Sequence, residues 1–244
     1  MKCALFILLL GCLLLAPAPS HATDFVVGIN DTEENARDNP EIRNLLQETF
    51  RRMGVKMRIV YLPLSRSLLD VSQGDVDGVA AHFKVEVEEF DNLVTVPQPM
   101  ARISYGVFSN AKIGTVKSWD DLAGRTLGIV RGDLPPRIEA MKRGIRIYDL
   151  NNGGNGFRML QAGRLDAMVY EKNFGILHLR EAVLDKVVES PLNLEGYTYF
   201  VLHERHADLA PKMARAFRDM LRDGSYALLL GRFNALTPPI TAED

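Results

Sequence analysis

The side chains that could do chemistry in this sequence are few, and they form no recognised catalytic pattern. After residue 22 the chain has four histidines, His82, His178, His203 and His206, and none accompanies an HExxH zinc motif or a GxSxG nucleophile elbow. His203 and His206 are three apart, but in a strand-to-loop segment they would not share a helical face. We therefore predict no catalytic residue, no metal site and no cofactor, and regard the polar residues as candidates for reversible binding.

One short pattern occurs twice and leads each time into a strand that polar residues follow. SQGDVDGVAAHF at 72–83 and QAGRLDAMVYEK at 161–172 both read as polar residues, a Gly, two residues, an Asp and an apolar run. The Gly of each copy, Gly74 or Gly163, is expected where a helix ends and the chain turns back, because Gly adopts positive φ at little cost. The Asp three residues later would stand at the strand entry.

Strand-like and helix-like segments alternate around both copies. This alternation predicts parallel strands with helices packed on both faces, in two α/β units. An amphipathic helix opened by Pro40 and ended by Gly54 belongs to the first unit. The other predicted strands and helices are strands 25–29, 57–62 and 78–81 with helix 63–72 in the first unit, and strands 126–130, 145–150 and 167–170 with helices 135–142 and 157–162 in the second.

Open α/β sheets bind ligands at the carboxyl ends of their strands. Asn30 follows the first strand, His82 and Phe83 follow the first repeated pattern, and Glu171 follows the second. These residues are candidate ligand contacts, and the two strand edges could face one another. Phe83 could stack on a ligand or pack between the two units.

The turn NNGGNG at 151–156 lacks the Lys-Ser/Thr pair of a phosphate loop, so it does not predict a nucleotide site. We interpret it as a flexible turn with Asn155 as the cap of the next helix. Its backbone amides would face the cleft between the two strand edges, which makes Asn155 a further candidate contact.

The first 22 residues predict a cleavable export signal. Lys2 precedes an apolar run that is too short for a membrane span, and small residues stand before the cleavage point after Ala22. An alternative is lipid attachment at Cys12. Cleavage after Ala22 would remove both cysteines of the chain, and the loss of Lys2 would change the formal charge from −2 to −3. This balanced charge predicts no nucleic-acid partner. From the export signal we expect a periplasmic protein, and we expect it to be a monomer.

The segment WDDLAGRTLGI at 119–129 resembles the DLxGxxxGV signature of bacterial extracellular solute-binding proteins of family 3, the amino-acid-binding type. GDVDGV belongs to the first copy of the repeated helix-Gly-strand pattern, which we call the joint. This joint and Pro97-Gln98-Pro99-Met100 precede the signature, where that family has a similar joint and an FSxPY-like element. GRLDA at 163–167, DGSY at 223–226 and Arg232-Phe233 follow in the family's order. The resemblance covers nearly all of the chain after the signal.

The resemblance implies a two-lobed periplasmic-binding-protein type II fold (Venus flytrap), each lobe a mostly parallel sheet flanked by helices. Lobe 1 would comprise residues 23–103 plus 195–244, and lobe 2 residues 104–194, with crossover strands near 102–109 and 192–202. The helical spacing of Leu209, Met213, Phe217, Met220 and Leu221 independently predicts a C-terminal helix that covers the sheet of lobe 1.

The sequence departs from the family at the Arg that grips a ligand's α-carboxylate. No Arg lies between Asp77 and Pro99, and the segment HFKVEVEEFD carries four acidic residues instead. This acidic run could be a solvated helix face, or it could line the cleft and favour a cationic ligand such as a polyamine. A third interpretation assigns the gripping to an Arg from elsewhere, for which Arg66 is the best candidate in lobe 1.

In lobe 2 the resemblance places ligand carboxylates at Arg131 and Gly132, before a helix start whose amides are free. It also places an acidic residue against the ligand's ammonium at Glu171.

The resulting prediction is a periplasmic substrate-binding protein that captures a small polar metabolite, amino-acid-like or cationic, and delivers it to an ABC-type permease. Two alternatives stay open. The closed form could signal to a receptor or kinase, or the protein could resemble the periplasmic cyclohexadienyl dehydratases of this fold, with His82 or Glu171 as general acid.

Overall fold

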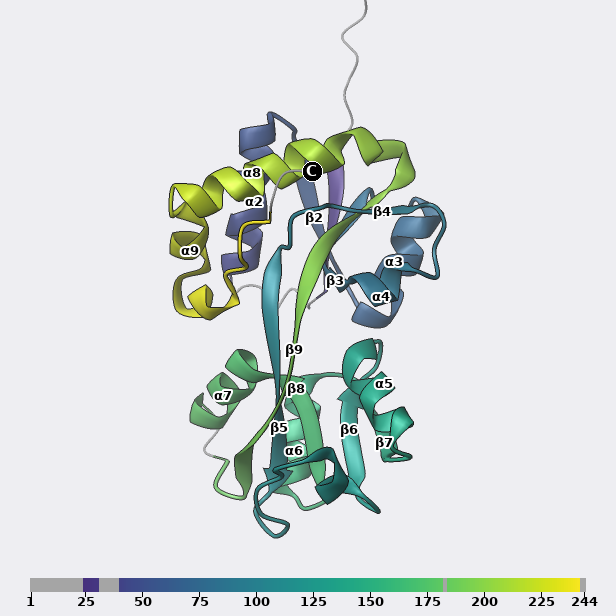
Figure 1. The fold of residues 1–244 in the computed structure, drawn as a ribbon, viewed down its shortest axis with the longest axis vertical. Coiled ribbons are helices and arrows are strands. Elements are labelled where there is room, and N and C mark those ends of the chain that lie inside the picture. The colour runs from purple at the N-terminus through teal and green to yellow at the C-terminus, as the bar shows by residue number, and fades with distance from the viewer. Residues whose placement is uncertain (1–23, 31–39, 182–183, 242–244) are drawn as a thin grey trace, which may run out of the picture.

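Two α/β lobes joined by a pair of long strands form the structure, a computed structural model that describes residues 24–30, 40–181 and 184–241 (Figure 1). The predicted export signal at 1–22, and with it Cys12, lies outside these residues. Within the described ranges, no helix combines the length and the apolar character that a membrane crossing requires.

Lobe 1 begins with three parallel strands in the order β2-β1-β3. Helix α2 follows β1 and ends at Gly54, which has the positive φ of 70° predicted for this C-terminal Gly. The elements of this part are β1 (Phe25–Asn30), α2 (Glu41–Met53), β2 (Met57–Leu62), α3 (Leu64–Gln73), β3 (Gly78–Phe83), α4 (Lys84–Val87) and β4 (Leu93–Thr95).

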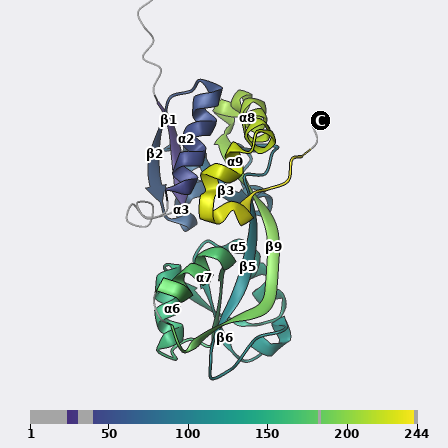
Figure 2. The same ribbon diagram turned by 90° about the vertical axis from the view of Figure 1, so that its left-hand side faces the viewer.

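Lobe 2 repeats the arrangement with strands in the order β7-β6-β8, again parallel. Its helices flank this sheet (Figure 2). The elements are η1 (Trp119–Leu122), β6 (Thr126–Val130), α5 (Leu134–Lys142), β7 (Arg146–Leu150), α6 (Gly153–Gln161), β8 (Ala167–Glu171) and α7 (Lys172–Glu181).

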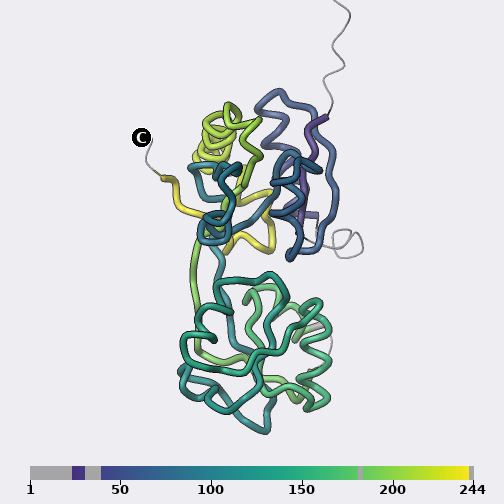
Figure 3. The backbone as a smooth tube through the Cα atoms, turned by 90° about the vertical axis from the view of Figure 1, so that its right-hand side faces the viewer, coloured from purple at the N-terminus to yellow at the C-terminus, as the bar shows by residue number. Residues whose placement is uncertain are grey.

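Two long antiparallel strands, β5 (Ala101–Asn110) and β9 (Val187–His203), connect the lobes (Figure 3). They pair with each other, with β3 on one side and with β8 on the other, so that one continuous sheet runs through both lobes. The predicted lobe boundaries fall inside these two strands and stay a prediction. The two-lobed α/β fold itself is confirmed.

The chain returns to lobe 1 at its C-terminal end, through η2 (Glu204–Leu209), α8 (Ala210–Arg222), α9 (Ser225–Leu230) and η3 (Gly231–Leu236). Met213, Phe217 and Met220 are fully buried in the core of lobe 1, where they share a cluster with Phe50 and Phe200. Each such side chain contributes about 1.5–3 kcal/mol of burial free energy. The predicted amphipathic C-terminal helix is therefore confirmed.

Both repeated patterns lie where they were predicted, between a helix end and a strand entry. Gly74 and Gly163 have φ of 82° and 68°. Asp77 Oδ2 accepts a hydrogen bond of 2.8 Å from the backbone N–H of Val26 in β1, and Asp166 Oδ2 accepts one of the same length from Thr126 in β6. In each lobe the joint thus ties the incoming strand to the start of its parallel neighbour.

Candidate functional site

A cavity of about 630 Å³ lies between the lobes, at the carboxyl ends of the parallel strands. This is where parallel α/β sheets place ligands, and both lobes and both crossover strands contribute to its walls. The lining residues are Asn30, Tyr61, Leu62, Pro63, Leu64, Ala81, Phe83 and Glu86 from lobe 1, Ile103, Tyr105 and Thr198 from β5 and β9, and Val130, Asp133, Asn151, Asn152, Gly153, Tyr170, Glu171 and Phe174 from lobe 2.

The lobes touch on two sides of this cavity. On one side Gly132, with φ of 93°, lies so close to the start of α3 that an added Cβ would be 2.8 Å from both Cα and N of Ser65. On the other side the rings of Phe174 in α7 and Phe233 in η3 are 4.6 Å apart. The cavity is therefore held between lobes that are in contact.

Asp133, which precedes α5, is a buried carboxyl group in the wall of the cavity. Its Oδ1 accepts a hydrogen bond of 2.5 Å from the hydroxyl of Tyr105 in β5. Burial raises the pKa of Asp133 to about 7; the hydrogen bond from Tyr105 opposes the rise, and the charge of Glu86 adds to it. Asp133 therefore titrates near neutral pH.

Glu171, at the end of β8, also lines the cavity, as the sequence predicted for this strand end. Its Oε2 accepts a hydrogen bond of 2.8 Å from the backbone N–H of Phe174, and its Oε1 accepts one of 2.9 Å from Asn173 Nδ2. Burial raises the pKa of Glu171, and these hydrogen bonds limit the rise. The carboxylate thus caps the first turn of α7 while facing the cavity.

His82 is fully buried in a hydrogen-bond network of lobe 1 and does not line the main cavity. Its Nδ1 is 2.8 Å from Glu86 Oε2, and its Nε2 is 2.9 Å from Ser67 Oγ and 3.0 Å from Asn30 Nδ2. The order Ser–His–Glu matches a hydrolase triad. However, Ser67 has no exposed surface and its hydroxyl donates to the carbonyl of Leu64, so no substrate reaches it. The network positions Asn30 and Glu86, which do line the cavity.

The acidic run 86–91 divides between the cavity and the solvent. Glu86 is buried and bound to His82, whereas Glu88, Glu89 and Asp91 are exposed. Of this run, Glu86 lines the interlobe cavity, and Glu89 lines a smaller cavity beside it. The solvated face and the cleft lining that the sequence left as alternatives are thus both present.

Besides His82, four predicted contacts lie outside the lining of this cavity: Arg66, Arg131, Gly132 and Asn155. The side chain of Arg66 is 65% exposed and pairs with Asp70 at 3.4 Å. Arg131 is exposed, and its backbone N–H donates to the carbonyl of Leu150. Gly132 lines a smaller neighbouring cavity that His82 and Glu86 share.

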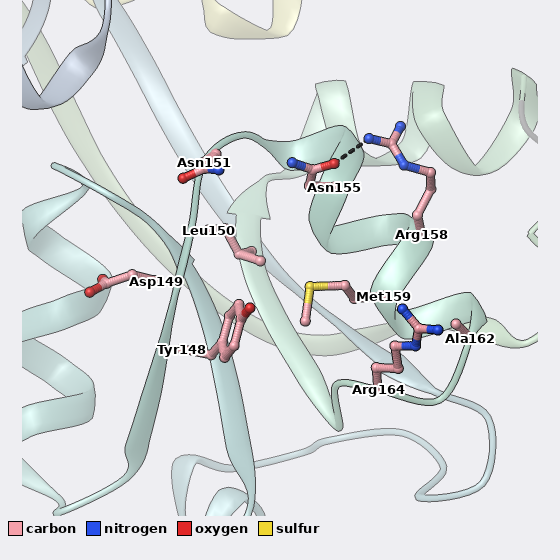
Figure 4. A pocket seen from close by; sticks show the side chains of 9 residues that line it. All are labelled: Tyr148, Asp149, Leu150, Asn151, Asn155, Arg158, Met159, Ala162 and Arg164. Carbon is pink, nitrogen blue, oxygen red and sulfur yellow. Dashed lines mark hydrogen bonds between the residues drawn. The ribbon is translucent and has the colours of Figure 1, made fainter.

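Asn155 lines a separate cavity of about 440 Å³ on the outer side of lobe 2, between β7 and α6 (Figure 4). Its side chain accepts a hydrogen bond from Arg158. The prediction that Asn155 caps α6 was wrong: the cap is Asn152, whose Oδ1 accepts a hydrogen bond of 2.8 Å from the Asn155 N–H. The residues of the turn that do reach the interlobe cavity are Asn151, Asn152 and Gly153.

Several lining residues were missed by the sequence analysis, above all the aromatic ones. Tyr105 and Thr198 belong to the crossover strands, and nothing local in the sequence marks their direction. Asp133 stands beside the predicted Arg131 and Gly132, and its place directly after a strand was an available signal. Among the residues that the structure describes, no group of three or more His, Cys, Asp or Glu side chains could hold a metal ion.

In comparisons by sequence, no family model and no curated protein matches this chain. Many solved structures share its fold. A histidine kinase sensor domain similar to periplasmic binding proteins superposes with a TM-score of 0.73 at 17% identity, covering 89% of this chain and 98% of the other. The GluR0 ligand-binding core from Nostoc punctiforme, in complex with glutamate, superposes with a TM-score of 0.72 at 15% identity. The superposition covers 86% of this chain and 99% of the other.

An amino acid ABC transporter substrate-binding protein from Streptococcus pneumoniae, bound to arginine, gives a TM-score of 0.68 at 15% identity, with 87% of this chain and 95% of that chain covered. These identities are low, so the comparison concerns the fold. The chain has the two-lobed fold of the amino-acid-binding periplasmic proteins that its sequence resembles.

Proposed function

We propose that this protein is a periplasmic substrate-binding protein that captures a small polar metabolite between its lobes and delivers it to an ABC-type permease. The observation that carries the proposal is the interlobe cavity of about 630 Å³, with polar strand ends from both lobes in its wall. Two adjacent crossover strands allow the lobes to move as hinged bodies, and ligand contacts to both lobes would shift the population toward the closed form.

The protein works by binding and release in this proposal, as a monomer and without covalent chemistry. His82 does not act as a general acid because both its ring nitrogens already have buried partners. The export signal predicted at residues 1–22 supports the proposed periplasmic location. A sensory role is the second candidate, favoured by the similarity to a histidine kinase sensor domain; it would use the same cavity and the same closure.

The test is native mass spectrometry of residues 23–244, purified from the periplasm without denaturation. A reproducible added mass is expected, and its value identifies the ligand. A bare protein that consumes prephenate or arogenate would contradict the proposal and support the dehydratase alternative. A bare protein without turnover would contradict both.

A further inference from the structure

The charged groups in the wall of the interlobe cavity all have the same sign. Glu86 from lobe 1 and Asp133 and Glu171 from lobe 2 line it, whereas none of its described lining residues is Lys or Arg. The three groups are close enough for their charges to act together on the hydroxyl of Tyr105. Gathering carboxylates in a water-poor cavity without a cation is unfavourable.

The wall also contains five aromatic side chains. Tyr61, Phe83, Tyr105, Tyr170 and Phe174 come from both lobes and from β5. Phe83 and Tyr105 lie nearly parallel, with ring centroids 6.1 Å apart. The faces of aromatic rings attract ammonium and guanidinium groups, with about 0.5–2 kcal/mol for each contact. Carboxylates and aromatic rings together form a surface that complements an organic cation.

Two buried polar atoms in the same wall have no partner among the described residues. Thr198 is 2% exposed and its Oγ1 makes no hydrogen bond, and neither does Asn30 Oδ1. Buried polar atoms are rarely left without a partner. Asn30 Oδ1 can only accept a hydrogen bond, whereas the Thr198 hydroxyl can donate as well as accept one.

A ligand carboxylate would meet no Lys or Arg side chain among the described lining residues of this wall. The Tyr105 hydroxyl donates to Asp133, and Asn30 Nδ2 faces Ala80 O and His82 Nε2. The start of α6 beside Asn152 offers backbone N–H groups, but it carries no formal charge, and its cap already satisfies the N–H of Asn155. A free carboxylate would share the cavity with three acidic side chains.

We propose that the cavity binds an organic cation, an amine or guanidine whose carbon skeleton lies against the aromatic rings, and that it selects against ligands with a free carboxylate. This inference rests on the proposed binding function and specifies its substrate class. Glu171 and Asp133 contact the cationic group.

The test uses probe pairs that differ only by the carboxylate: phenylalanine with phenethylamine, lysine with cadaverine, and arginine with agmatine. Isothermal titration calorimetry at about pH 8, where Asp133 is ionised, gives both affinities of each pair. We expect an amine to bind at least about tenfold more tightly than its amino acid. Glu171→Gln should weaken that binding by about tenfold, whereas Glu88→Gln, in the exposed part of the acidic run, should leave it unchanged.

Tighter binding of the amino acid in every pair that binds would overturn the inference while leaving the proposed binding function in place. Failure of all three amines would overturn it as well. In that case the native mass measurement decides separately whether the cavity binds any small molecule at all.

Discussion

The two lobes use the same joint but surround it differently. In lobe 1, Asp77 holds β1 and also accepts hydrogen bonds from Arg205 at 2.5 Å and His206 at 2.7 Å, which belong to the C-terminal return. In lobe 2, the side chain of Asp166 has one hydrogen bond to the described residues, the one from Thr126 in β6. The joint positions a strand end in both lobes, whereas the surroundings decide how firmly it is held.

The strand ends beyond the joints differ in the same way. In lobe 1 the polar groups near the ends of β1 and β3 are mostly hydrogen-bonded to one another, through His82, Glu86, Ser67 and Asn30. In lobe 2, Asp133 and Glu171 reach the cavity as carboxyl groups whose pKa burial raises. Lobe 1 thus supplies a fixed wall, and lobe 2 supplies most of the titratable charge.

The largest effect is expected from removing the lobe 1 joint. Burial alone would raise the pKa of Asp77, but the hydrogen bonds from Val26, Arg205 and His206 hold it below its ordinary value. The ionised Asp77 therefore stabilises the fold at pH values above the pKa that it has in the unfolded chain. This contribution is lost as the pH falls through the pKa of the folded state. Asp77→Ala should lower the free energy of unfolding by about 3 kcal/mol, and Asp166→Ala by about 1 kcal/mol. Urea denaturation at neutral pH measures both, and equal losses would contradict the asymmetry.

Asp133 should affect stability with the opposite sign. Its pKa is raised from 3.8 to about 7, so its protonated form favours the fold at low pH, and this contribution is lost as the pH rises through 7. This pKa shift corresponds to a change of at most about 4 kcal/mol in the free energy of unfolding. Opening of the lobes would hydrate the carboxyl group, so we expect about half of that change. Asp133→Asn should therefore stabilise the ligand-free protein at about pH 8 but not at about pH 4. The exposed Asp208→Asn is the control, and a gain that is independent of pH would refute this assignment.

Gly132 tests whether the contact between the lobes is needed for binding. Gly132→Ala places a Cβ against the backbone of Ser65 and should weaken ligand binding at least about tenfold, or about 1.4 kcal/mol, because the lobes cannot approach fully. Gly144→Ala is a matched control: its φ of 64° is also positive, but the space around it is open. Calorimetry with the ligand identified by mass spectrometry measures both, and equal losses would attribute the effect to backbone strain alone.

The smallest expected effect concerns the bulge in β3. Ala81 has a φ of 64°, and the register of β3 against β9 shifts between Val79 and His82. Ala81→Gly should relieve this strain and stabilise the fold by about 0.5 kcal/mol. Ala167→Gly, in the regular strand of the other joint, should destabilise it by about 1 kcal/mol. Two changes of the same sign in thermal denaturation would show that β3 is not strained.

The features that the sequence predicted are those that local residues determine. Gly74 and Gly163 mark a helix end by themselves, and the spacing from Leu209 to Leu221 defines one helical face. The Tyr105–Asp133 pair could not be predicted, since it depends on how β5 crosses between the lobes. Arg66 lies in the predicted helix, but its side-chain direction does not follow from spacing. Asn152 and Asn155 both suit a cap, and the choice depends on where α6 begins.

The return of the chain to lobe 1 also determines the order in which the protein can be completed during synthesis. The core of lobe 1 needs Phe200, Met213 and Phe217 against Phe50, and β3 needs β9 as its neighbour. All residues of β6, β7 and β8 are made before these partners exist. The sheet of lobe 2 can therefore form first. The sheet and core of lobe 1, although β1, β2 and β3 are made earlier, can be completed only after β9 and α8 have been synthesised.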